Sequence, residues 1–160
     1  MEHVKATGKA RSIGVSNFLQ SHLETILETA TVVPSVNQIE YHPYLQHGNL
    51  VSWQQSKGIA TVSYSGLTPV TRAAGGPLDQ LLPGFAKKYG VTPGEILLRW
   101  CLDQGVISIT TSSKETRLAS YLRVLTFKLT PQEIEEISAV GKTHHHRAFW
   151  KDKFAEDDRS

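Results

Sequence analysis

The stretch Ser12-Ile13-Gly14-Val15-Ser16, together with the apolar residues that follow it at helical spacing, decides the fold class of this chain. Those apolar residues are Leu19, Leu23, Ile26 and Leu27. A short apolar run that leads into such a pattern is typical of a β-strand followed by an amphipathic helix. Strand-like runs recur at 33–39, 59–64 and 106–110, and helical patterns follow them. Repeated βα units of this kind predict an α/β fold with a parallel sheet.

Capping signals mark where several helices begin. Thr92-Pro93-Gly94-Glu95 combines an N-cap threonine, a proline at the first helical position and a glutamate three residues after the cap. Thr130-Pro131-Gln132-Glu133 repeats this signal, and Ser112-Ser113-Lys114-Glu115 predicts another capped helix. The expected helices span 49–56, 78–89, 93 to about 104, 112 toward 121, and 130 to near 141.

The composition is that of an ordinary globular domain. Hydrophobic residues make up 39% of the 160 residues, and 17 basic against 15 acidic side chains leave a net charge of +2. This composition argues against disorder, and the scattered basic residues do not indicate a nucleic-acid partner. No apolar run approaches the roughly 20 residues of a membrane helix, and residues 1–11 lack the apolar core of a signal peptide. We therefore expect a soluble, cytoplasmic protein.

The number of βα units suggests a partial barrel. Four such units are half of an eight-stranded α/β barrel, which typically needs about 250 residues. An open four-stranded sheet is the alternative, but it would leave two apolar edges without partners. Residues 65–77 separate the third strand from its helix by a loop of about a dozen residues, which is long enough to suggest a functional loop.

Several motifs resemble those of the aldo-keto reductases. Gly8-Lys9-Ala10-Arg11-Ser12-Ile13-Gly14-Val15-Ser16-Asn17-Phe18 looks like the fifth-strand signature of that family, and Val36-Asn37-Gln38-Ile39-Glu40-Tyr41-His42-Pro43-Tyr44 looks like the sixth. Residues 60–67 resemble the seventh-strand segment. The motifs follow the family order from residue 8 to about 137, and Thr110-Thr111-Ser112-Ser113-Lys114 is most similar to fungal members that reduce ketones and aldehydes.

This resemblance implies the architecture of the whole chain. Family members are (α/β)8 TIM barrels that bind an extended nicotinamide dinucleotide at the carboxyl ends of their strands. Residues 1–142 would then form the four C-terminal βα units of such a barrel, a half-barrel that ends in a C-terminal helix. Residues 143–160 would form a tail that resembles the substrate loop.

The resemblance also assigns residues to the nicotinamide end of the cofactor. Ser16, Asn17 and Gln38 match positions that hydrogen-bond the carboxamide, and Tyr64 matches the aromatic residue that stacks on the ring. Asn and Gln side chains offer both the donors and the acceptor that an amide requires. Alternatively, Ser16 and Asn17 cap the next helix, Gln38 is an ordinary polar strand residue and Tyr64 packs at the barrel mouth. Ser65 and Leu67 belong to the same cofactor-binding segment.

A second segment resembles the adenosine 2′-phosphate site of the family. It contains Thr111, Ser112, Ser113, Lys114 and Arg117. A helix start offers free backbone N–H groups, and an arginine pairs with phosphate oxygens in a bidentate way, so NADPH is favoured over NADH. Many relatives carry lysine where Thr111 stands and asparagine where Tyr121 stands; Lys114 could replace the first and Tyr121 could stack on adenine. The alternative is a capped surface helix with solvated charges.

The tail raises two further questions. Three adjacent histidines, 144–146, invite a metal site, but neighbouring positions do not converge on one ion in a regular element, so a solvated basic segment is expected instead. The single cysteine excludes cysteine-based metal clusters. Phe149 and Trp150 are candidate walls of the substrate pocket, because the family's C-terminal loop lines that pocket; packing back onto the body is the alternative. His42 is expected to be structural.

The catalytic residues of the resembling family fall outside the matched segments. A tyrosine acts there as general acid, tuned by a lysine and an aspartate, and a histidine orients the substrate. All four belong to the first four strands, whereas this chain begins in what resembles the end of the fourth helix. We therefore expect an NADP-dependent aldo-keto reductase that reduces a small carbonyl compound, truncated so that this tetrad is absent, with no catalytic residue of its own.

A repurposed half-barrel is the second hypothesis. It would act by ligand binding, self-association or a non-redox reaction. Half-barrels have a physical reason to form homodimers, since pairing would bury the unpaired edges of the first and fourth strands.

Overall fold

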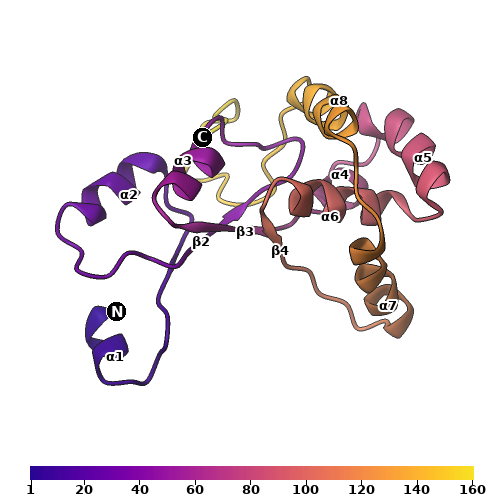
Figure 1. The fold of residues 1–160 in the computed structure, drawn as a ribbon. Coiled ribbons are helices and arrows are strands. Elements are labelled where there is room, and N and C mark those ends of the chain that lie inside the picture. The colour runs from indigo at the N-terminus through magenta and orange to yellow at the C-terminus, as the bar shows by residue number, and fades with distance from the viewer.

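The computed structural model describes residues 1–160 and contains one four-stranded parallel sheet in the order β1-β2-β3-β4 (Figure 1). The strands are β1 (Val15–Ser16), β2 (Val36–Glu40), β3 (Ala60–Tyr64) and β4 (Ile107–Ser108). The helices are α1 (Glu2–Ala6), α2 (Gln20–Leu27), α3 (Leu50–Ser56), α4 (Thr68–Thr71), α5 (Leu78–Tyr89), α6 (Pro93–Asp103), α7 (Glu115–Arg123), the 3-10 helix η1 (Val124–Thr126) and α8 (Pro131–Lys142). Helical segments connect successive parallel strands, so the predicted α/β fold is confirmed.

The edge strands are shorter than the sequence predicts. β1 and β4 contain two residues each, whereas their apolar runs extend over five. Each of them has a strand neighbour on one side only, so fewer ladder hydrogen bonds hold it in the extended conformation. The expected loop between β3 and α5 also contains the short helix α4, which has a proline in its first turn.

Two of the three predicted helix caps are present. The hydroxyl of Thr92 accepts a hydrogen bond from the Glu95 N–H at 3.3 Å, and Thr130 accepts one from Glu133 in the same way. Both glutamates return the bond to the cap backbone. The prediction for the helix after β4 was wrong in detail: α7 begins after Lys114, which makes no side-chain cap.

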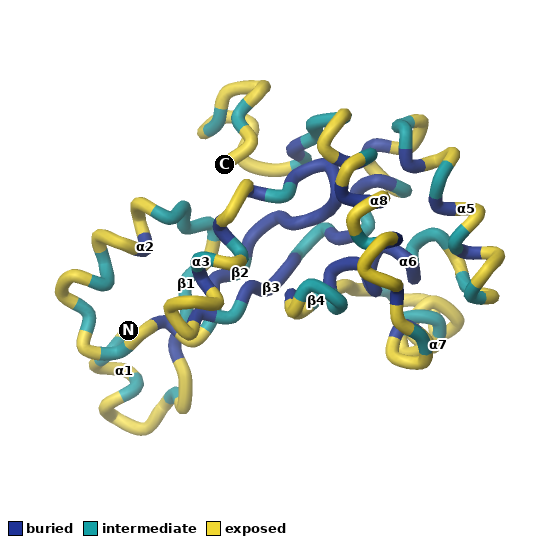
Figure 2. Tube along the Cα trace, turned by 45° about the horizontal axis from the view of Figure 1, so that its top comes forward, coloured by how far each residue is buried: buried dark blue, intermediate teal, exposed yellow.

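The core lies where α6 packs between the sheet and the neighbouring helices α5 and α8. Figure 2 shows buried residues concentrated along β2, β3 and α6, while α1, α2 and α7 are largely exposed. Trp100 of α6 is fully buried, stacks on Tyr41 and donates its indole N–H to Ser138 Oγ at 3.0 Å. None of the helices is both long enough and apolar enough to cross a membrane.

The two faces of the sheet differ in what covers them. On one face, Thr61 and Ser63 are buried against helices, where Gln54 of α3 donates to the Thr61 hydroxyl at 3.1 Å. Side chains in register on parallel strands share a face. The other face therefore carries a row formed by Ser16, Gln38, Val62 and Ile107. We call this the open face, because Ser16 and Ile107 at the two ends of the row are exposed, whereas Val62 between them is buried.

Candidate functional site

The loop after β1 places two predicted cofactor residues beside β2. Ser16 Oγ donates to the carbonyl oxygen of Gln38 at 2.8 Å, and the backbone N–H of Asn17 donates to the same oxygen at 2.9 Å. Asn17 adopts a left-handed conformation with φ of 58°. The buried Asn37 side chain holds the loop by donating to the Phe18 carbonyl at 2.8 Å and accepting from its N–H at 3.3 Å. These contacts position Ser16 and Asn17 at the carboxyl end of β1.

The helix-cap alternative for Ser16 and Asn17 is not what the structure shows. The N-cap of α2 is Leu19, whose N–H donates to His22 Nδ1 at 3.2 Å. Ser16 and Asn17 lie before this cap, and their side chains bond to Gln38 and Tyr64 instead.

Tyr64 meets Asn17 across β2. Its hydroxyl donates to Asn17 Oδ1 at 2.7 Å, which brings together residues from the ends of β1 and β3. Burial raises the pKa of the Tyr64 hydroxyl above its ordinary value. Ser65, the next residue, is left-handed with φ of 61°, and Leu67 packs against the core. The residues predicted to contact the nicotinamide therefore lie next to one another. Leu67, which was predicted to bind the cofactor as well, packs against the core instead.

Glu40, at the end of β2, is a site residue that the sequence analysis missed. Its side chain is 2% exposed and accepts hydrogen bonds from His42 Nε2 at 3.1 Å, Ala148 N at 2.8 Å and Phe149 N at 3.1 Å. Burial alone would raise the pKa of Glu40, but these hydrogen bonds outweigh it and keep the pKa below its ordinary value. The sequence does contain a signal for Glu40, since it is a charged residue at the end of an otherwise uncharged strand-like run.

The two predicted substrate residues lie over the same strand ends. The Phe149 ring meets Tyr64 edge-on, with centroids 5.7 Å apart, and the Arg72 guanidinium lies 4.8 Å from the Phe149 ring centre. Trp150 is 47% exposed and lines a hollow next to Asn17 and Tyr64. That hollow measures about 10 Å³, which is no more than one water molecule requires.

The second predicted cluster follows β4 and is open to solvent. Thr111, Ser113, Lys114 and Arg117 are exposed, and the side chains of Lys114 and Arg117 make no ion pair within the chain. Ser112 accepts a hydrogen bond from the Lys114 N–H at 3.0 Å, which forms a turn before α7. Two free cationic side chains beside a helix start are suited to phosphate oxygens. Because the sheet is parallel, this cluster shares the strand-end edge with Tyr64.

A comparison with known protein families identifies the family of this chain. The profile of the Aldo/keto reductase family matches residues 1–142. The chain belongs to this family. The predicted fold, four βα units of an (α/β)8 barrel, is also confirmed: an aldo-keto reductase of Bombyx mori in complex with NADP superposes with a TM-score of 0.85 at 33% identity, over 96% of this chain and 52% of that one.

Curated relatives of this aldo/keto reductase chain include fungal enzymes. The NAD/NADP-dependent indole-3-acetaldehyde reductase of Schizosaccharomyces pombe is 42% identical over 153 residues, which cover 94% of this chain and 54% of the relative. The NADPH-dependent alpha-keto amide reductase of Saccharomyces cerevisiae is 35% identical over 157 residues, covering 94% and 50%. The chain therefore spans about half the length of the relatives it matches.

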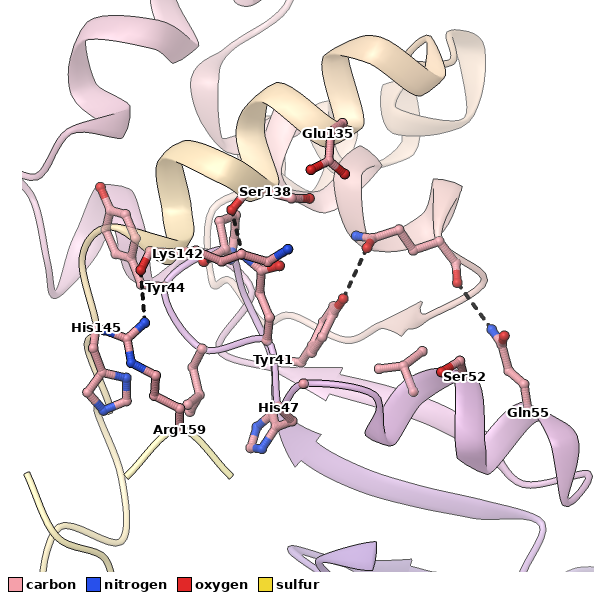
Figure 3. Close-up of a pocket in the computed structure, with 16 residues that line it drawn as sticks. Tyr41, Tyr44, His47, Ser52, Gln55, Glu135, Ser138, Lys142, His145 and Arg159 are labelled. Carbon is pink, nitrogen blue, oxygen red and sulfur yellow. Dashed lines mark hydrogen bonds between the residues drawn. The ribbon is translucent and has the colours of Figure 1, made fainter. Parts of the chain in front are cut away.

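A large cavity of this aldo/keto reductase chain lies away from the predicted residues. It measures about 820 Å³ and opens between the loop after β2, α3, α8 and the tail (Figure 3). Hydrogen bonds join some of the residues that line it: Tyr41 donates to Gln104 Oε1 at 3.2 Å, and Gln55 donates to the Gln104 carbonyl at 3.2 Å. None of the residues predicted to bind cofactor or substrate lines it. Cavity size therefore does not locate the strand-end site.

The three tail histidines pack against the body. The His144 ring meets Tyr44 edge-on at 4.7 Å between centroids, and the His146 N–H donates to the Tyr44 carbonyl at 3.2 Å. His144, His145 and His146 are half-buried, so the expectation of a solvated segment was wrong, because Tyr44 offers both a ring and a carbonyl. Within residues 1–160, no three or more His, Cys, Asp or Glu side chains gather to hold a metal ion.

Proposed function

We propose that this chain forms the cofactor-holding part of an NADP-dependent reductase that converts a small aldehyde or ketone to an alcohol by hydride transfer. The observation that carries the proposal is the meeting of Ser16, Asn17, Gln38 and Tyr64 at one edge of the sheet. The nicotinamide-dependent carbonyl reductases among the relatives support it.

The residues present fit a nicotinamide group. The side-chain amide of Gln38 makes no hydrogen bond within the chain and lies in register with Ser16 on the open face, so both can bond to a carboxamide. Tyr64 offers an aromatic surface beside them, held by Asn17. A bound nicotinamide would supply the hydride, while these side chains fix its orientation.

The cluster after β4 supports NADPH rather than NADH. Arg117 and Lys114 are exposed and unpaired, and an arginine binds a 2′-phosphate through two parallel hydrogen bonds. Many relatives carry a lysine where this chain has Thr111. In this chain Lys114 supplies that positive charge instead. Tyr121 is half-buried on the same helix, where its ring is a candidate stacking surface for adenine.

The tyrosines of this chain favour binding over proton donation. A general-acid tyrosine needs a pKa shifted from about 10 toward neutrality. Burial instead raises the pKa values of Tyr41, Tyr44, Tyr64 and Tyr89. We therefore expect cofactor binding without normal turnover by this chain alone, with Phe149 and Trp150 forming part of the wall of the carbonyl pocket.

A fluorescence titration with NADPH tests this proposal, with aldehyde and ketone turnover measured in the same sample. Arg117→Ala is expected to weaken NADPH binding about 10- to 100-fold and to leave NADH binding nearly unchanged, because it removes only the contact with the 2′-phosphate. Tyr64→Ala is expected to weaken both cofactors. Lys87→Ala, an exposed cation on α5, is the matched control.

Two outcomes would contradict the proposal. Equal loss of NADPH and NADH affinity in Arg117→Ala would remove the assignment of the phosphate site. Robust turnover by the 160-residue chain would contradict its role as a binding part without catalysis.

The cytoplasmic location of the protein stays a prediction.

Self-association is a second candidate function, favoured by one observation. Ile107 of β4 is 48% exposed and Ile109 just after it 40%, and Leu118, Leu122 and Leu125 are exposed on α7 and η1, which follow β4 in the chain. We propose that a second copy covers this surface and the free strand edges.

A further inference from the structure

A cavity in the tail after α8 gathers basic side chains. It measures about 350 Å³, and its lining includes His145, His146, Arg147 and Lys151 together with the ring of Phe154. One water molecule takes up about 30 Å³ in the liquid, whereas pockets for small molecules measure about 300–1,000 Å³. We call this cavity the tail pocket. Its volume is sufficient for a small ligand, and none of the residues predicted to bind cofactor or substrate lines it.

Arg147 distinguishes the tail pocket from an ordinary surface hollow. The residue is 8% exposed, and none of the ion pairs of the chain includes it. Its Nη2 atom donates to the backbone carbonyl oxygens of Asp158 at 3.3 Å and Ser160 at 2.6 Å. Its Nε atom is fully buried without a partner, and Nη1 makes no hydrogen bond within the chain although solvent reaches it. A buried guanidinium therefore keeps an N–H group, on Nη1, for an external acceptor.

The carboxylates whose charge acts on Arg147 are bonded to other groups. Glu40 accepts three hydrogen bonds from other residues. Asp158 accepts from the N–H of Ser160 at 2.8 Å and from its hydroxyl at 2.5 Å. Burial lowers the pKa of Arg147 in spite of these two negative charges. The chain therefore compensates the charge of this arginine only in part.

The groups around Arg147 complete a set of donors for an oxyanion. The Phe154 ring lies 3.9 Å from the guanidinium carbon, and a guanidinium stacked on a ring keeps its N–H groups directed outward in its own plane. Lys151 is exposed and makes no ion pair. Burial first, and neighbouring cations second, lower the pKa values of His145 and His146. An anion in the tail pocket would offset this excess of positive charge.

We propose that the tail pocket binds a phosphate-type oxyanion, either inorganic phosphate or the phosphate group of a small monoester, with Arg147 as the buried donor and Lys151 at the rim. A phosphate presents at least three oxygens and accepts from both cations at once, whereas a carboxylate presents two. Lys114 and Arg117 follow β4 and do not line this pocket. The proposal therefore goes beyond the proposed function and does not rest on it.

A titration with inorganic phosphate followed by the backbone amide NMR shifts of the unaltered chain tests the location of the site. Phosphate replaces chloride at constant ionic strength, so that general screening does not change. Shifts are expected at residues 145–156, which hold the tail pocket. Phosphate bound after β4 would shift residues 112–117 instead, so the two sites are read separately in one experiment.

Two exposed residues of the pocket give variants with opposite expected effects. Lys151→Ala is expected to weaken phosphate binding about 2- to 5-fold, because an attractive exposed charge is lost. Glu156, the one carboxylate in the lining, repels an anion, so Glu156→Gln is expected to tighten binding about twofold. Lys153→Ala and Asp157→Asn make the same charge changes at exposed positions outside the lining and are the matched controls.

A further variant tests the buried donor. Arg147→Lys keeps the positive charge but removes the planar guanidinium, so phosphate binding is expected to weaken about 10- to 100-fold. If this variant fails to fold, the two exposed substitutions still decide the proposal, because they alter no buried group.

The remaining outcomes decide the chemistry of the ligand. Phosphate shifts confined to residues 112–117, or equal effects of Lys151→Ala and Lys153→Ala, would overturn the tail pocket as a site. Acetate that binds there as tightly as phosphate would overturn the phosphate class. Tighter binding of glycerol phosphate than of inorganic phosphate would support a monoester ligand, and equal binding would support inorganic phosphate. Failure of the chain to bind NADPH would contradict the proposed function and leave the phosphate shifts of the tail unaffected.

Discussion

Glu133 shows how one side chain joins two helices. Its carboxylate accepts hydrogen bonds from Lys88 Nζ at 2.7 Å, from the Tyr89 hydroxyl at 2.6 Å and from the Thr130 N–H at 2.7 Å. Burial alone would raise the pKa of Glu133, but the bonds from Lys88, Tyr89 and Thr130 lower it to about 2. The carboxylate thus links the start of α8 to the end of α5.

Glu133→Gln is expected to lower the free energy of unfolding by about 1–2 kcal/mol near pH 7, because charge-assisted hydrogen bonds are lost. The folded-state pKa lies below the ordinary value of 4.5, so this contribution is complete above 4.5 and declines as the pH falls toward about 2. Urea unfolding at about pH 7 and about pH 3 measures the difference between the two proteins at each pH. Glu136→Gln is the control, and a difference that does not shrink at low pH would contradict the linkage.

At the scale of elements, the contact between β1 and β2 requires a glycine. A Cβ atom at Gly14 would lie 2.5 Å from Val36 Cγ2 and 2.8 Å from the Val36 carbonyl oxygen. Both distances are shorter than carbon contacts in proteins allow, so the two backbones approach closely only because residue 14 lacks a side chain. This approach sets the position of Ser16 and Asn17.

Gly14→Ala is therefore expected to destabilise the chain by about 1–3 kcal/mol, since β1 must move away from β2. Gly84→Ala is the matched control: it lies inside α5 with nothing within 4 Å of the added carbon and is expected to stabilise by about 0.5–1 kcal/mol. Thermal and urea unfolding measure the change in the free energy of unfolding of both variants. Equal stability of the two variants would show that β1 adapts without cost.

Prediction of the elements from sequence succeeded where the signals are local. The helix at 78–89 was predicted with its observed bounds, and Gly90 ends it in the left-handed conformation with φ of 67°. Thr92 and Thr130 cap their helices as predicted, because a cap depends on four consecutive residues. The lengths of β1 and β4 were wrong, because the number of neighbouring strands, which the local sequence does not contain, limits how far a strand stays paired.

At the scale of the whole molecule, Ile107 and Ile109 at the β4 edge of the sheet leave apolar side chains in water. Ile107 → Glu is expected to weaken self-association, because a charge there would have to be desolvated in an interface. Sedimentation velocity over a range of concentrations measures the average mass of both proteins. Thr29→Glu adds the same charge at an exposed position after α2 and is the control. A chain that stays monomeric at all concentrations would contradict the prediction.

The order of the strands and helices along the chain, most helix starts and the family motifs could all be read from the amino-acid sequence. These motifs contain Ser16, Asn17, Gln38 and Tyr64. These features depend on side-chain periodicity, on caps and on short motifs, which are local. The bond between Tyr64 and Asn17 and the bond from the Ala148 N–H to Glu40 became visible only in the folded structure. Such contacts join residues far apart in the chain, and their formation depends on packing that brings the segments together against the entropy of the connecting chain.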